Sequence, residues 1–107
     1  MVKAEVETGG RLLRALLLEL PNACFLLVCE GDFKLGTLAM AIPMAPHGPP
    51  GPTSSPILGH RHSLVARMLA ERLAGLLGKI ALVSLRAEGS EAEVGARALE
   101  ALKKVLE

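Results

Sequence analysis

The 107-residue sequence predicts a single α+β domain over residues 1–107, with a mostly antiparallel sheet of five to six strands and two helices packed on it. Four apolar stretches separated by turn signals occupy the first part of the chain, which indicates successive strands. Two stretches with helical spacing follow, and a short apolar run separates them. The expected order is therefore β-β-β-β-loop-α-β-α.

The first two strands are predicted as a hairpin. Apolar and charged residues alternate from Val2 to Thr8, as in a half-buried strand, and two glycines follow as a turn. The composition of the next segment, Arg11 to Leu20, favours a helix. Its alternating leucines and the turn signals on both sides favour a strand, and we predict a strand there.

The third and fourth strands complete the expected antiparallel meander. The run from Cys24 to Glu30, "CFLLVCE", is apolar and lies between two turn signals, which is typical of a buried strand. A turn at residues 31–32 leads to the fourth strand, Leu35 to Ile42, which ends at a proline.

After residue 62, apolar residues recur at the spacing of a helix, with Ser63 as the expected N-cap and Gly78 as the expected C-terminal cap. The apolar face of this helix is wider than packing on one sheet requires. The branched run "KIALVSL" that follows predicts the fifth strand. Ser90 and Glu93 have the spacing of a capping box and predict the start of the last helix.

Two cysteines, Cys24 and Cys29, are five positions apart on one predicted strand and therefore point to opposite faces of the sheet. They cannot pair with each other, so we expect two buried free thiols. Glutamine is absent and Asn22 is the only asparagine, which fits a thermophilic source.

Charge and composition exclude several classes of function. The net charge is +1 and only two residues are aromatic, which argues against nucleic-acid binding. No apolar run reaches the length of a membrane span, and no basic leader precedes a signal-like core. We therefore expect a cytoplasmic protein that does not bind a membrane.

No catalytic constellation is present. The sequence "GLLGKI" lacks the spacing and the hydroxyl residue of a phosphate-binding loop. Neither Ser54 nor Ser55 lies in a nucleophile-elbow pattern. We expect no enzymatic activity and no cofactor. An alternative is a small-ligand or metal-binding domain that uses the loop histidines His47, His60 and His62.

Three stretches together resemble the small proteasome assembly chaperones, most closely the chaperone 4 type. They are "LAMAIP" at Leu38 to Pro43, "TSSPILG" at Thr53 to Gly59, and "LAERLAGLLGKIALVSL" at Leu69 to Leu85. The resemblance covers most of the chain from Leu16 onward. The basic "HRH" after Gly59 departs from the family, which tends to carry acidic and hydroxyl residues there.

The resemblance implies a non-enzymatic dimeric chaperone, here a homodimer, that assists the assembly of proteasome α-type subunits into rings. Six of the seven prolines lie in a loop at residues 43–62. Because prolines lower the entropy lost when a loop is ordered on a partner, residues 44–62 are one candidate docking arm. The alternative is a long connection that proline stiffens for thermostability. The candidate partner-binding residues are Met44, Pro46, Pro49, Pro50, Ser54, Ser55, Ile57, Leu58 and Arg61.

Overall fold

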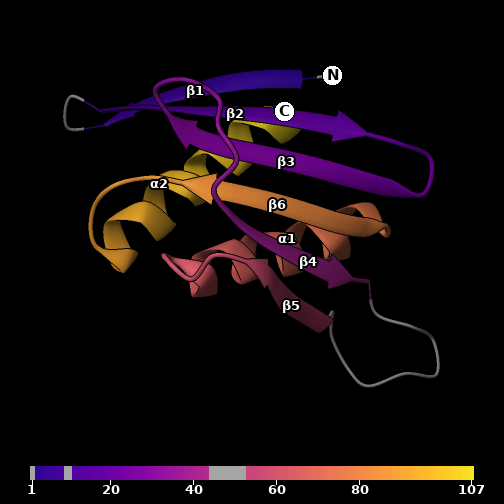
Figure 1. The fold of residues 1–107 in the computed structure, drawn as a ribbon. Helices are drawn as coiled ribbons and strands as arrows, with labels where there is room; N and C mark the ends of the chain where they lie inside the picture. The colour runs from indigo at the N-terminus through magenta and orange to yellow at the C-terminus, as the bar shows by residue number, and fades with distance from the viewer. Residues whose placement is uncertain (1, 9–10, 44–52) are drawn as a thin grey trace.

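The computed structural model describes residues 2–8, 11–43 and 53–107, which form one mixed sheet with two helices (Figure 1). The elements, in chain order, are β1 (Val2–Thr8), β2 (Arg11–Glu19), β3 (Ala23–Glu30), β4 (Thr37–Ile42), β5 (Thr53–Leu58), α1 (Ser63–Leu77), β6 (Ile80–Arg86) and α2 (Glu91–Leu106). The α+β class, the two helices and the strand at residues 11–19 are as predicted.

The sheet has the strand order β1-β2-β3-β6-β4-β5, so the expected four-strand meander is wrong at its last step. β1, β2 and β3 pair antiparallel in sequence, but β6 lies between β3 and β4 and runs parallel to β3. β6 has apolar side chains on both of its faces, which suits the centre of a sheet better than an edge. Its insertion separates β4 from β3.

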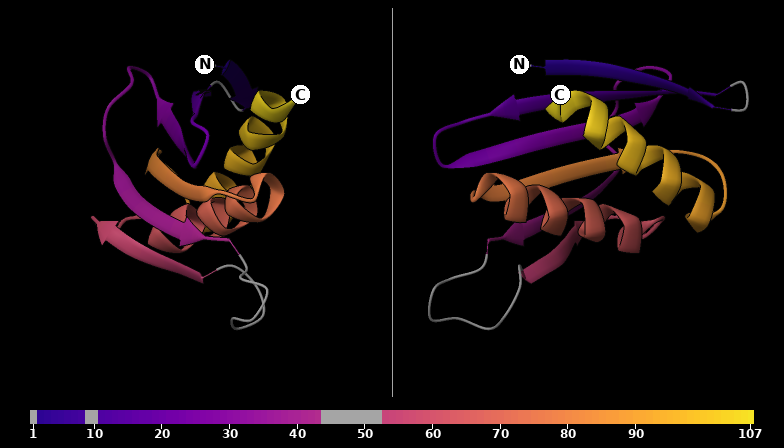
Figure 2. Two further views of the ribbon diagram at one scale, coloured as in Figure 1. Left: turned by 90° about the vertical axis from the view of Figure 1, so that its right-hand side faces the viewer. Right: turned by 180° about the vertical axis from the view of Figure 1, so that it is seen from behind.

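Both helices lie on one face of the sheet, as the two views of Figure 2 show. α1 packs on β4, β5 and β6, whereas α2 packs on β1 and β2, and the two helices also touch each other. The core lies between the helices and this face. Fully buried leucines from both layers meet there: Leu13, Leu26, Leu69, Leu73, Leu85 and Leu102.

The helix ends match the predicted caps in all but one case. Gly78 closes α1 in the left-handed conformation, and the Ser90 hydroxyl accepts a hydrogen bond from the Glu93 amide at the start of α2. The expected N-cap at Ser63 is wrong. His62 occupies that position with φ 57°, and its side chain makes no capping hydrogen bond.

The proline-rich segment contains a strand that was predicted as loop. β5 pairs antiparallel with β4 at one edge of the sheet and includes Pro56. Proline lacks an N–H and is therefore tolerated at a sheet edge. The register of this pair shifts between Leu38 and Ala39, which leaves Ile57 without a partner on β4.

Two further predictions concern the cysteines and the membrane. Cys24 and Cys29 are both buried free thiols, as expected. Cys24 belongs to the helix-covered core, whereas Cys29 lies in register with Arg14 and Arg86 on the other face. In the described ranges, the structure contains no helix that is long and apolar enough to cross a bilayer.

Candidate functional site

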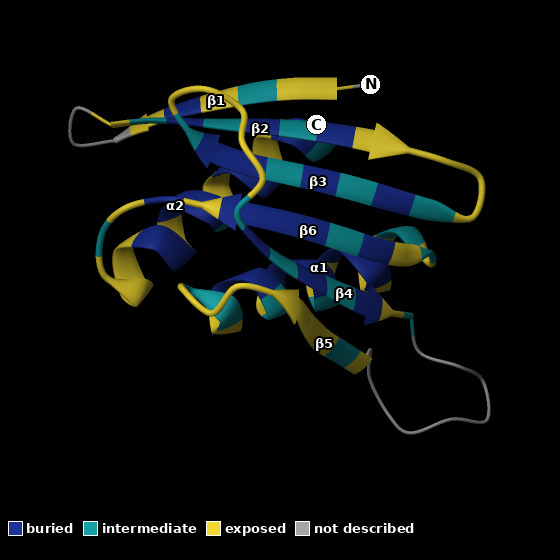
Figure 3. Ribbon diagram, viewed as in Figure 1, coloured by how far each residue is buried: buried dark blue, intermediate teal, exposed yellow. Residues whose placement is uncertain are grey.

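The face of the sheet that the helices leave uncovered carries mostly apolar side chains on its four central strands. Figure 3 shows that buried and partly exposed residues alternate along these strands. Side chains alternate between the two faces of a strand, so the residues next to the helix-covered core residues point to this uncovered face. We call this surface the open face. Its central apolar members are Leu16 and Leu18 on β2, Phe25 and Leu27 on β3, Leu82 on β6, and Leu38 and Met40 on β4.

Strand register places these side chains side by side. Phe25 lies between Leu18 of β2 and Leu82 of β6, and Leu82 in turn lies opposite Met40 of β4. Cross-strand neighbours of this kind pack against each other, which is why most of them are only partly exposed. Leu18 keeps 43% of its surface exposed. The result is a continuous apolar band that a single chain leaves in contact with water.

Charged side chains lie at the margins of this band. On the edge strand β1, every second residue lies on this face and is charged: Lys3, Glu5 and Glu7. Nε of Arg14 on β2 lies 3.7 Å from the Glu5 carboxylate. Arg86, at the end of β6, is exposed on the same face of the sheet, where it lies in register with Cys29. The open face therefore has the apolar centre and polar rim of a protein–protein interface.

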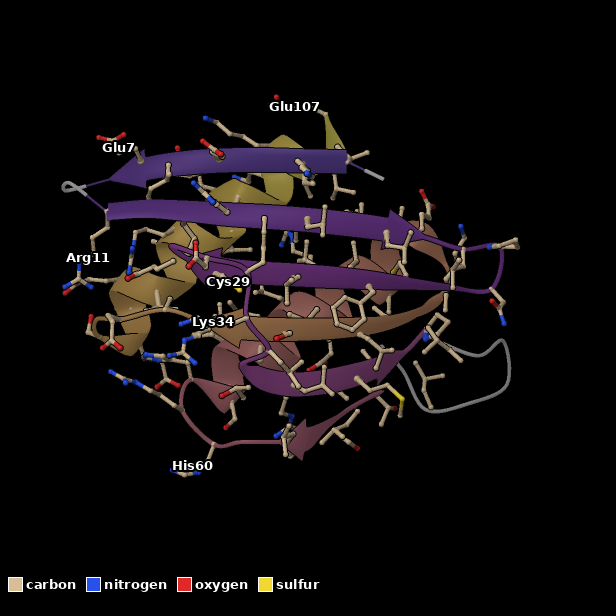
Figure 4. The ribbon with its side chains drawn as sticks, turned by 45° about the horizontal axis from the view of Figure 1, so that its top comes forward. Glu7, Arg11, Cys29, Lys34, His60 and Glu107 are labelled. Atoms are coloured by element: carbon tan, nitrogen blue, oxygen red, sulfur yellow. The ribbon has the colours of Figure 1, made fainter. Side chains whose placement is uncertain are left out.

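Residues 31–36 connect β3 to β4 by crossing the open face, and we call this segment the strap (Figures 1 and 4). The Cys29 thiol lies beneath it, where Sγ is 3.0 Å from the carbonyl oxygen of Lys34 and 3.4 Å from its backbone nitrogen. Burial raises the pKa of the Cys29 thiol above its ordinary value of 9.0, although the backbone hydrogen bond from Lys34 opposes that shift.

The strap is held a second time where it joins β4. The Gly36 N–H donates a 2.8 Å hydrogen bond to the hydroxyl of Ser84, a buried polar residue in the middle of β6. A Cβ on Gly36 would lie 2.3 Å from the carbonyl oxygen of Leu85, so only glycine allows this approach. Phe33 and Leu35 of the strap are 37% and 56% exposed and extend the apolar surface.

A cavity of about 350 Å³ opens at the end of the sheet, between the strap, the C-terminal end of β6 and residues 59–62. His60, Arg61 and His62 all line it, together with Arg86 and Glu88. Arg61 forms an ion pair with Glu88 at 2.6 Å, and both side chains are more than half exposed. In the part of the chain that the structure describes, no three His, Cys, Asp or Glu side chains gather as metal ligands. His47 lies outside that part.

A charged cluster fixes the chain between β6 and α2. Arg97 is 7% exposed, and its Nη1 lies 2.9 Å from Oε1 of Glu30, while its Nη2 donates to the Glu88 carbonyl oxygen at 2.6 Å. Arg11 donates to the same carbonyl at 2.7 Å. These contacts join the ends of β2 and β3 to α2, so the cluster is structural.

The structure divides the predicted arm into three parts. Met44, Pro46, Pro49 and Pro50 lie outside the described residues. Ser54 faces α1, where its hydroxyl donates to Glu71 at 2.7 Å and accepts from Nε of Arg67 at 3.2 Å. Arg67 and Glu71, four positions apart on α1, therefore meet at the Ser54 hydroxyl. The remaining predicted residues are exposed: Ser55, Ile57, Leu58 and Arg61.

Sequence reasoning did not select the open face as a site. The signal was present in β2 and β3, where leucines occupy both faces, as in strands buried on two sides. Two helices cover only one side of the six-stranded sheet, so apart from the strap no segment of the described chain covers the apolar side chains on the second side. Ser84 and Gly36 had no signal at all, because their contact is 48 positions apart in sequence.

The fold and this surface define a class: a small α+β protein with one helix-covered face and one open apolar face. The chain is similar in fold to a chain of a solved structure described as "Crystal Structure of a Novel Chaperone Complex for Yeast 20S Proteasome Assembly". The TM-score is 0.64 at 17% sequence identity, and the match covers 99% of this chain and 94% of that one. No protein-family model matches the sequence, and no curated protein matches it.

Proposed function

We propose that this protein is a non-enzymatic assembly chaperone that works as a homodimer in the cytoplasm and binds α-type proteasome subunits. The observation that carries the proposal is the open face, because an exposed apolar band marks a protein-interaction surface. The fold likeness to a chain of a proteasome assembly chaperone complex supports the choice of function. Two free thiols are compatible with a reducing compartment.

A second copy of this chain is the occupant that best suits the open face. An isologous contact places the same patch of both subunits together, so charges near the two-fold axis would meet like charges. The apolar side chains that form the band carry no charge. Lys3, Glu5 and Glu7 stand at its edge on β1, and Arg14 lies beside it on β2. A chain of this size also gains from additional burial, since its surface is large for its volume.

The arm supplies the proposed contact with the α-type subunit. Ile57 and Leu58 are 50% and 52% exposed on the edge strand β5, which gives the arm two apolar side chains next to its prolines. Ser54 is better assigned to positioning, because it ties β5 to α1 through Arg67 and Glu71. In this proposal Ser55 and Arg61 flank the apolar pair.

Light scattering after size exclusion tests the dimer directly. The wild-type chain is expected at twice the mass of one chain, and Leu82→Lys, at the centre of the open face, at the mass of a monomer. Leu64→Lys is the matched control, because Leu64 is 62% exposed on α1, on the other side of the sheet. A wild-type monomer at high concentration would contradict the homodimer. An unchanged dimer of Leu82→Lys would contradict the open face as its interface.

Co-expression with the α-type proteasome subunit of the same organism tests the client. Capture of the subunit by the wild-type chain is expected, together with its loss when Ile57 and Leu58 are both changed to Ser. A Gly/Ser replacement limited to residues 44–52 separates the proline segment from β5. A stable dimer that captures no α-type subunit would contradict the chaperone function and leave the open face as a dimer interface.

A further inference from the structure

The outward side of α1 has a row of exposed side chains that the open face does not account for. Leu64, Met68, Arg72 and Leu76 follow one another at four-residue spacing. The three apolar members are 62%, 40% and 60% exposed. Side chains four apart form a ridge along a helix, which is the feature that packs into the groove of a second helix.

A groove lies next to this ridge. The groove follows the neighbouring row of α1 residues at four-residue spacing, Arg67, Glu71 and Gly75. The Arg67 and Glu71 side chains turn away from the ridge to contact Ser54 on β5. The exposed Gly75 has no side chain, so the row ends in a gap. Leu64, Arg67, Met68 and Glu71 enclose a hollow of about 370 Å³, which is room for one apolar anchor.

Charge selects the kind of partner. Among the described residues, Arg72 makes no ion pair within 4.0 Å, although it stands between Met68 and Leu76 on the ridge. The first turn of α1 has no acidic residue either. In an isologous contact between two copies of α1, each Arg72 would approach the Arg72 of the other copy, which disfavours a second copy as occupant.

We propose that the ridge and groove of α1 bind an amphipathic helix of another protein, with an apolar stripe flanked by carboxylates. The stripe packs on Leu64, Met68 and Leu76, one of its side chains enters the hollow, and a carboxylate pairs with Arg72. α1 lies on the side of the sheet opposite the open face, as Figure 2 shows, so a dimer formed through the open face keeps both copies of this surface available.

The test uses a designed peptide of about 18 residues, long enough to hold a helix, with leucines four and three apart and glutamates beside them. Amide chemical shifts of the labelled protein are followed as the peptide is added to millimolar concentration. Saturable shifts concentrated at residues 64–76 are expected. A matched peptide with lysines in place of the glutamates is expected to bind about fivefold more weakly, since attraction at Arg72 becomes repulsion.

Two variants locate the contact. Arg72→Glu is expected to reverse the preference between the two peptides, and Leu64→Ser with Leu76→Ser to abolish binding while the fold, followed by circular dichroism, stays intact. All three substitutions are at exposed positions, so they leave the core unchanged. Absence of saturable shifts on α1, equal affinity for both peptides, or shifts centred on the open face would overturn the proposal.

Discussion

The hydroxyl of Ser84 accepts a 2.8 Å hydrogen bond from the backbone N–H of Gly36, and this contact holds the strap to the centre of the sheet. Ser84 is fully buried, and it is the polar residue at a position of β6 that would otherwise continue the apolar band. The bond gives a partner to the buried Ser84 hydroxyl and to the partly buried Gly36 N–H at once. It also sets how far the strap stands above the open face.

Ser84→Ala removes the acceptor and leaves the Gly36 N–H unsatisfied. Because the partly buried Gly36 N–H then keeps part of its desolvation penalty, we expect a loss of about 1–2 kcal/mol in the free energy of unfolding. Urea denaturation measures it, and amide hydrogen exchange at Gly36 is expected to accelerate. Ser55→Ala, at an exposed position of β5, is the control and should change stability by less than about 0.5 kcal/mol. Equal effects of the two variants would show that the bond contributes nothing.

Gly36→Ala tests the close approach of the strap to β6. The added Cβ would lie 2.3 Å from the Leu85 carbonyl oxygen, which is backbone and cannot move aside without shifting the strand. We expect a loss of about 3 kcal/mol or more by urea denaturation. Gly31→Ala has φ +71° but open space around its Cβ, so it should cost only about 1 kcal/mol. A Gly36→Ala variant no less stable than Gly31→Ala would contradict this placement of the strap.

The two thiols predict how stability depends on alkaline pH. Burial raises the pKa of both Cys24 and Cys29 above the ordinary value of 9.0, so the folded state keeps its thiol protons where the unfolded state loses them. Stability from this source is therefore complete below pH 9 and falls as the pH rises above it. The expected slope is up to about 1.4 kcal/mol per pH unit for each thiol.

Urea denaturation between neutral pH and pH about 10 measures that slope. The double variant Cys24→Ala with Cys29→Ala is less stable at neutral pH, because it loses packing, but its stability should fall less steeply with pH. Parallel pH profiles for the wild-type and double-variant chains would rule out the thiols as the cause.

Substitution of two arginines that contact similar partners should lower the free energy of unfolding by very different amounts. Arg97→Met leaves Glu30 without its near partner and the Glu88 carbonyl with one donor fewer, and we expect a loss of about 2–4 kcal/mol. Arg61→Met breaks the ion pair with Glu88, in which the side chains are 61% and 62% exposed, and should cost less than about 1 kcal/mol. Thermal or urea unfolding compares them, and similar losses would contradict the distinction.

The local sequence pattern was sufficient to predict structure wherever a residue's neighbours in sequence are also its neighbours in space. The alternation in β2, the antiparallel pairing of β1 with β2 and the Ser90–Glu93 cap depend on residues close in sequence, and each was predicted. The Ser63 cap failed, because His62 turns the chain one residue earlier in a left-handed conformation that composition does not indicate. β5 was missed, since its pairing with β4 extends a sheet edge on which proline is tolerated.

The sequence by itself determined the class of fold, the two helices, the strands of the first half and the placement of the two cysteines on opposite faces of one strand, because periodicity records which side of an element a residue faces. Only the tertiary structure decided that β6 lies between β3 and β4, that the strap crosses Ser84 and that one sheet face remains open. Those features depend on contacts between residues far apart in the chain. Periodicity shows that a residue is apolar on a given face, but the neighbour that covers it is set by how the elements pack.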